Sequence, residues 1–115
     1  MVSRPIWDAA FADELLGKRL LVGLNYLGQD GNLIEQQQCF GRVHELVQHS
    51  RIELTLEGGR HGEVFAIPPD MRLIVAASPG QYRLRSTDEV VVDPDYTVTF
   101  SIQKQSDEKR EADSD

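Results

Sequence analysis

The chain has 115 residues, of which 12 are Lys or Arg and 19 are Asp or Glu, so its formal net charge at pH 7 is −7. This length suits a single domain with one modest hydrophobic core. The acidic balance provides no general attraction to phosphate backbones or anionic lipids, and it therefore disfavours nucleic-acid and membrane binding.

The cysteine content and the apolar segments indicate the compartment. Cys39 is the single cysteine and cannot form an intramolecular disulfide. The sequence shows neither the apolar core of a signal peptide nor the roughly 18 consecutive apolar residues of a membrane span. We therefore expect a cytoplasmic protein. No basic pair lies beside Cys39 to lower its pKa, so we expect it to pack in a strand and not to act as a nucleophile.

The first segment has the pattern of an amphipathic helix. Ser3 is a candidate N-cap, a proline follows in the first turn, and Gly17 provides a C-terminal stop. Three apolar residues lie four apart on one face: Trp7, Phe11 and Leu15. The pattern predicts a helix over about residues 4–16.

Two strands joined by a hairpin turn are predicted next. Apolar residues alternate from Leu20 to Tyr26, and the letters QDGN at 29–32 contain the Asp-Gly signal of a tight turn. The following run starts near Leu33 and is too long for a flat strand. Gly41 in its middle predicts a bulge or a sharp bend.

Further strands follow at short intervals. Ile52, Leu54 and Leu56 alternate with polar residues, which predicts a strand with one buried face. The next strand, with Phe65 and Ile67 on one face, ends at the double proline after residue 67, because proline donates no backbone hydrogen bond.

The sequence before the acidic tail predicts three more strands. They are a short strand over 71–78, a shorter or irregular strand over 82–94, and a final strand over 95–103. The final strand alternates, and we expect four of its residues to face inward: Tyr96, Val98, Phe100 and Ile102. Residues 106–115 contain five acidic and two basic residues, which predicts a disordered acidic tail.

These elements predict a mainly β fold: a small antiparallel SH3-like barrel of 5–7 strands with one N-terminal α-helix, formed by residues 1–105. Three stretches resemble the Sm-like layout, in which a helix precedes five strongly bent strands. They are LLGKRLLVGL (15–24), FGRVHEL (40–46) and RIELTL (51–56). The chain has QHSR and ASPG where Sm-like proteins have their RNA-binding loops, and GQDGNLIEQQQ lengthens its first hairpin. The resemblance therefore supports the barrel topology more than RNA binding.

The candidates for chemistry are few. His44, His49 and His61 match no metal-binding spacing, so we expect no metal and no cofactor. His61 and Glu63 would point the same way in an extended segment, as a base and its orienting carboxylate do. No activated Ser or Cys accompanies them, so we expect a protein that is not an enzyme, with a hydrolase using His61 as the third hypothesis.

One group of residues suggests an interaction surface. Arg83 and Arg85 share a face beside Tyr82, with Arg72 on a possible neighbouring strand and His61 in a turn. Acidic residues follow almost at once, which favours a solvated, ion-paired face. The first functional hypothesis is a non-catalytic protein-interaction module, with a protein partner or a homo-oligomer formed through barrel edges. The alternative is an Sm-like or SH3-like module that binds RNA.

Overall fold

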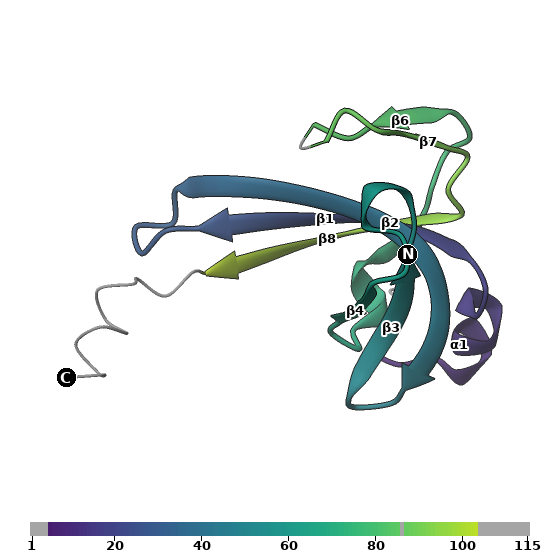
Figure 1. Ribbon diagram of the computed structural model, residues 1–115. Helices are drawn as coiled ribbons and strands as arrows, with labels where there is room; N and C mark the ends of the chain where they lie inside the picture. The colour runs from purple at the N-terminus through teal and green to yellow at the C-terminus, as the bar shows by residue number, and fades with distance from the viewer. Residues whose placement is uncertain (1–4, 86, 104–115) are drawn as a thin grey trace.

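The computed structural model describes residues 5–85 and 87–103, and these form one α-helix, two 3-10 turns and eight strands (Figure 1). The predicted acidic tail at 106–115 lies outside the described residues. In chain order the elements are α1 (Ala9–Leu15), β1 (Arg19–Leu27), β2 (Leu33–Val47), β3 (Arg51–Leu56), η1 (Gly58–Arg60), β4 (Val64–Ile67), η2 (Met71–Leu73), β5 (Ile74–Ala76), β6 (Gln81–Arg83), β7 (Val90–Val92) and β8 (Tyr96–Gln103).

The strands form a six-stranded sheet in the order β4-β3-β2-β1-β8-β5 and a separate two-stranded sheet of β6 and β7. The predicted mainly β fold with one helix is confirmed. The finer prediction, an SH3-like barrel of 5–7 antiparallel strands, is not confirmed: the sheet is not closed, the described residues form eight strands, and β8 runs parallel to β1. Within the described residues, no ladder joins β4 to β5. The double proline ends β4, and η2 then leads directly into β5 beside β8.

The helix is shorter than predicted because its cap lies further along the chain. Asp8 is extended and its Oδ1 accepts a hydrogen bond from the Phe11 N–H at 3.2 Å, so α1 starts at Ala9 and not near residue 4. The proposed cap Ser3 lies outside the described residues. Phe11 and Leu15 are buried as predicted, and Gly17 follows the helix with a φ of +84°.

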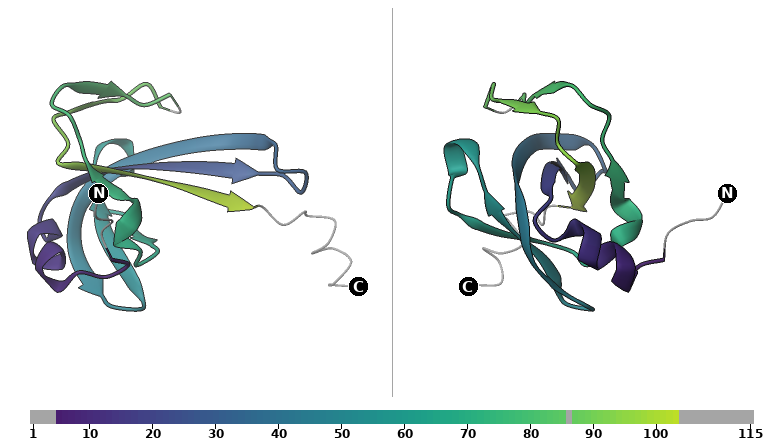
Figure 2. Two further views of the ribbon diagram at one scale, coloured as in Figure 1. Left: turned by 180° about the vertical axis from the view of Figure 1, so that it is seen from behind. Right: turned by 90° about the vertical axis from the view of Figure 1, so that its right-hand side faces the viewer.

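β2 is continuous over fifteen residues because it bends, as its central glycine predicts (Figure 2). A Cβ on Gly41 would lie 2.3 Å from the carbonyl oxygen of Thr55, so only glycine permits this approach of β3. The register with β3 shifts between Val43 and Glu45, which leaves His44 in a bulge. The first half of β2 therefore pairs with β1 alone and the second half with β3.

Two hydrophobic cores lie on opposite faces of the six-stranded sheet. The larger core joins α1, η2 and the inner face of the sheet; its fully buried members include Leu15, Leu20, Ile52, Leu54, Leu56, Met71 and Ile74. The smaller core contains Leu21, Leu84 and Val91, with Phe40 and Tyr82 packed against it. It holds the β6–β7 hairpin over the opposite face. The predicted single irregular strand over 82–94 is therefore two strands joined by a turn, in which the Leu84 N–H donates to the Glu89 oxygen at 2.7 Å.

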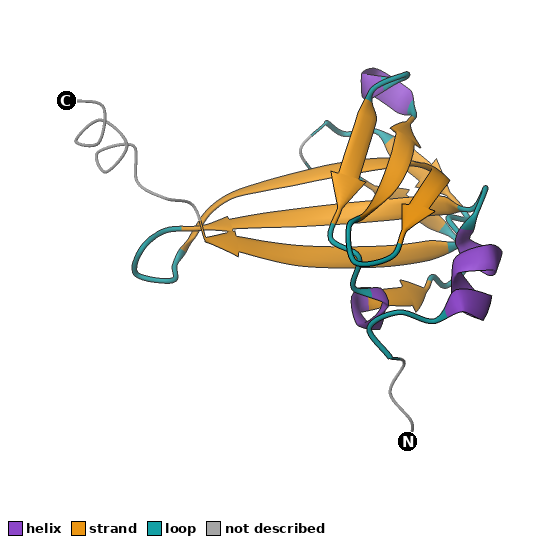
Figure 3. Cartoon of the chain, turned by 90° about the horizontal axis from the view of Figure 1, so that it is seen from below, coloured by secondary structure: helices purple, strands orange, loops and turns teal. Residues whose placement is uncertain are grey.

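Three strands extend beyond the rest of the sheet (Figure 3). We call this three-stranded extension the arm and define it as residues 23–27 of β1, 33–38 of β2 and 99–103 of β8. The predicted Asp-Gly hairpin joins β1 and β2 at its end, where Gly31 has a φ of +85°. None of the helices in the described part of the chain has the length and apolar character that a bilayer crossing requires.

Candidate functional site

The predicted interaction residues are divided between elements on opposite sides of the six-stranded sheet. Arg72 lies in η2, next to Met71 of the larger core, and its guanidinium bonds both oxygens of Asp70 at 2.9 and 2.7 Å. These hydrogen bonds lower the pKa of the Asp70 carboxyl. The positive charge of Arg72 is therefore compensated by the Asp70 carboxylate. Arg72 does not lie with the basic residues of the β6–β7 hairpin.

The other predicted residues lie on or beside that hairpin. The Tyr82 hydroxyl donates to the Ser78 carbonyl at 2.6 Å, and the ring packs on the smaller core. Arg83 forms an ion pair with Asp88 at 3.2 Å. Arg85 follows β6, and its backbone N–H donates to Oε1 of Gln38 at 2.6 Å. The structure thus brings Tyr82, Arg83 and Arg85 together on one element, but Arg83 is paired with a carboxylate.

His61 is exposed at the end of η1, where its backbone N–H donates to the Gly58 carbonyl at 3.0 Å. The Glu63 carboxylate bonds Arg60 at 2.9 and 3.1 Å. The geometry therefore couples Glu63 to a cation and does not pair it with His61. Arg60 also lies over the ring of Phe65, 5.7 Å from its centroid.

Cys39 is buried in the larger core, opposite Val22 of β1, as expected for a packing residue. Burial raises the pKa of its thiol, because the thiolate would lose its hydration there. The thiol of Cys39 is therefore a weaker nucleophile at neutral pH than the thiol of a solvent-exposed cysteine.

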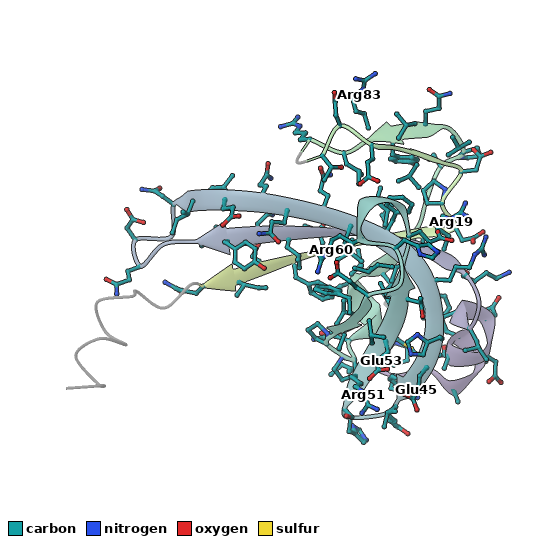
Figure 4. The ribbon with its side chains drawn as sticks, viewed as in Figure 1. Arg19, Glu45, Arg51, Glu53, Arg60 and Arg83 are labelled. Carbon is teal, nitrogen blue, oxygen red and sulfur yellow. The ribbon has the colours of Figure 1, made fainter. Side chains whose placement is uncertain are left out.

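An ion-pair cluster at the β2–β3 turn was not anticipated from the sequence (Figure 4). His44 Nε2 lies 3.0 Å from Glu53 Oε1, and its Nδ1 lies 2.8 Å from the Thr55 hydroxyl. Potential ligand atoms of His44, Glu45 and Glu53 all lie within 4.8 Å of one another. Arg51 binds both carboxylates, so an added metal ion would have to displace its guanidinium. The bulge at His44 and the turn create this grouping, and neither is visible as a spacing motif.

A polar pocket of about 300 Å³ lies on the face of the arm that the β6–β7 hairpin covers. Its lining includes Gly23, Asn25, Gln36, Gln38, Thr99 and Arg85. Gly23 pairs with Gln38 on one side and Thr99 on the other, so it forms the floor between two polar walls. One wall is held in place by a hydrogen bond of 2.9 Å from Gln36 to the side-chain oxygen of Asn25.

An apolar groove of about 160 Å³ lies on the inner face of the arm. It separates β4 from the outer half of β8 and is lined by Leu24, Phe65, Ala66, Ile67, Pro68, Phe100, Ser101 and Ile102. Polar atoms contribute little to this lining. Ile102, at its outer end, is 40% exposed, although its position in the alternation predicts an inward-facing residue.

The strand edges beside this groove are unpaired within the described residues. β5 pairs with β8 only at Tyr96–Val98, so within the sheet that the structure describes Thr99–Gln103 is paired with β1 alone. β4 likewise pairs only with β3. The segment 99–103 contains no charged residue and no proline, which are the features that usually protect an exposed edge.

Neither a protein-family model nor a curated protein nor a solved structure matches the chain. The resemblance to SH3-like and Sm-like domains stays a prediction.

Proposed function

We propose that the protein is a protein-interaction module that binds an extended segment of a partner protein along β8. The observation that carries this proposal is the uncharged edge of Thr99–Gln103, which no other described strand pairs on the side away from β1, beside the apolar groove between β8 and β4. An unpaired edge offers backbone N–H and C=O groups that another strand can bind.

The groove adds side-chain recognition to this backbone pairing. Successive side chains of an added strand point to opposite faces. One set would therefore reach the inner face, where Phe100 and Ile102 border the groove, and the other set would face solvent. Because the groove is apolar and small, it suits one aliphatic or aromatic side chain.

The charge of the molecule favours one kind of partner. The formal net charge of −7 attracts basic segments over the distances at which encounter is steered. The edge at Thr99–Gln103 is uncharged, so it repels neither positively nor negatively charged partner segments. We therefore infer a partner segment in which apolar residues alternate with polar ones and Lys or Arg lies at the flanks.

A displayed library of random peptides tests this proposal. The intact chain should select extended peptides with alternating apolar residues and basic flanks. Ile102→Lys should abolish their binding, because it places a charge at the groove. Val92→Lys is the matched control: Val92 is 50% exposed, like the 40% of Ile102, but it lies on the separate β6–β7 sheet.

Two results would overturn the proposal. One is a selected peptide set that binds Ile102→Lys as well as it binds the wild-type chain. The other is a concentration-dependent dimer, seen by light scattering, that Ile102→Lys dissociates and Val92→Lys retains. That dimer would show that a second copy of the chain covers the edge and that no partner peptide is needed.

The nucleic-acid hypothesis has less support from the geometry. Arg72 and Arg83, two of the three arginines on which it rests, are paired with Asp70 and Asp88. Binding of single-stranded RNA that weakens steeply with added salt would favour it over peptide binding.

A further inference from the structure

The polar pocket contains a glycine that the fold does not require. Gly23 lies in the middle of β1, and its φ is not in the left-handed region. A Cβ at this position would lie 3.4 Å from the Thr99 hydroxyl oxygen, which is an ordinary contact. Glycine weakens a strand interior, and there it often marks a bulge, a tight bend, or a site that a ligand or another backbone approaches closely. Its missing side chain keeps the floor of the pocket open.

Arg85 lines the pocket and differs from the other arginines that the structure describes, because it forms no ion pair with any of the described residues. Among the described residues, six arginines have a carboxylate oxygen within 4 Å: Arg19, Arg42, Arg51, Arg60, Arg72 and Arg83. No such ion pair forms at the Arg85 guanidinium within the described part of the chain. The backbone of Arg85 is nevertheless fixed, because its N–H donates to Gln38 at 2.6 Å. The pocket is thus lined by an exposed arginine whose main chain is held in place and whose guanidinium has no carboxylate partner among the described residues.

The remaining walls offer neutral hydrogen-bonding groups. Asn25, Gln36 and Gln38 each have amide donors and acceptors, and Thr99 has a hydroxyl. Some of this capacity is used between Asn25 and Gln36 and by the Arg85 N–H. A volume of about 300 Å³ is at the lower end of the range for small-molecule sites.

From these observations we propose that the pocket binds a small organic phosphate or carboxylate. The oxyanion binds the Arg85 guanidinium, which has the planar geometry for bidentate contact. The polar body of the ligand lies over Gly23 between the amides of β2 and Thr99 of β8. This site lies on the opposite face of the arm from the apolar groove, so it does not depend on the proposed peptide binding.

The test is an NMR titration of the full isotope-labelled chain with uridine monophosphate, citrate and uridine. The first two carry a phosphate or carboxylates on a polar body, and uridine lacks the anion. We expect saturable shifts at Gly23, Gln38, Arg85 and Thr99 with at least one of the two anions. Uridine should bind at least about tenfold more weakly than its phosphate, since charge-assisted hydrogen bonds are lost.

Three variants make the result specific. Arg85→Gln should weaken anion binding about tenfold or more, whereas Arg83→Gln should leave it unchanged, because Arg83 already pairs with Asp88. Gly23→Val should fill the floor and abolish binding while the melting temperature stays at or above that of the wild type. If Gly23→Val fails to fold, Gly23→Ala replaces it, since the added methyl group makes only ordinary contacts.

Three results would overturn the proposal. The first is the absence of saturable shifts at these residues with both anions at about 10 mM, where a Kd of 1 mM would be evident. The second is equal binding by the wild type and Arg85→Gln. The third is detectable and equal binding of uridine and uridine monophosphate. Selection of peptides at the β8 edge would be unaffected by any of these.

Discussion

At the scale of single residues, two glycines of the central strands have different reasons to be glycine. Gly41 is required by packing, because a Cβ would lie 2.3 Å from a backbone oxygen of β3. We predict that Gly41→Ala lowers the free energy of unfolding by about 1 to 3 kcal/mol or more, as overpacking against backbone does. Urea denaturation measures this. Gly23→Ala is the matched comparison and should be neutral or stabilising by up to about 1 kcal/mol.

Equal destabilisation by the two substitutions would mean that Gly23 also has a structural role, and the open floor of the polar pocket would lose its significance. The sequence indicated the bend at Gly41 from its place in a run too long for a flat strand. It gave no sign that Gly23 was different, because the neighbours that distinguish the two glycines come from β3 and β8.

The Arg51 and Glu53 pair predicts a pH dependence. The hydrogen bond from Arg51 lowers the pKa of the Glu53 carboxyl below its ordinary value of 4.5, with a smaller contribution from His44. A carboxyl whose pKa is lower in the folded state stabilises the fold above pH 4.5, and this contribution is lost as the pH falls through the folded-state value.

Arg51→Gln should therefore reduce the melting temperature near neutral pH and leave it nearly unchanged in strong acid. The effect will be small, since both side chains are accessible to solvent. Melting curves of the two proteins recorded from about pH 7 down to about pH 2 compare them. A constant difference across that range would show that the ion pair does not cause the change.

At the scale of elements, β8 shows how far alternation can be trusted. Periodicity placed Val98, Phe100 and Ile102 on one face, and the structure agrees. It did not show that the strand leaves the core: Phe100 is 7% exposed, whereas Ile102 is 40% exposed on the arm. Period two identifies a face, but the cover on that face depends on elements far away in the sequence.

We predict that Phe100→Ala lowers the free energy of unfolding by roughly 3 to 5 kcal/mol, the range for an emptied buried aromatic site. Ile102→Ala should cost clearly less, because much of its side chain already contacts water. Denaturant midpoints of the two variants decide this. Similar losses at both positions would mean that the groove beside Ile102 is covered in solution.

The short strands β6 and β7 have little hydrophobic periodicity in the sequence, and the start of α1 has an ambiguous capping signal. β6 and β7 have three residues each, and of the residues that the structure describes, Leu84 and Val91, with Leu21 of the main sheet, form the buried core beneath them. Such short strands carry no measurable periodicity. The start of α1 was misplaced for a related reason, since Ser3 and Asp8 are both good caps by residue type.

At the scale of the whole molecule, the open sheet was beyond the reach of local signals. Alternation gives the faces of strands but not their order. The parallel pairing of β1 with β8 joins residues 76 positions apart, such as Leu20 and Tyr96. The edges of β4 and β8 that are unpaired among the described strands, on which the proposed function rests, follow from this order. The pocket and the groove likewise depend on which strands lie side by side, so neither was predictable from residue types.

The two cores on opposite faces of the sheet predict that the molecule opens in two steps. The hairpin of β6 and β7 is attached through a small core, in which Leu84 is fully buried. Leu84→Ala should leave a cavity there and release the hairpin, because this core supplies its apolar attachment and the hydrogen bonds that also hold it, from the Arg85 N–H to Gln38 and from the Gly59 N–H to Glu89, are exposed to solvent. Backbone amides of Tyr82 and Val91 should then lose protection from hydrogen exchange, while those of Ile52 and Leu54 in the larger core keep theirs.

Since the hairpin leads into Arg85, the same Leu84→Ala variant should weaken anion binding at the polar pocket without affecting peptides at the β8 edge. Uniform loss of protection across both sheets would show instead that the cores form one cooperative unit, and the hairpin could not then be regarded as a separable cover of the pocket.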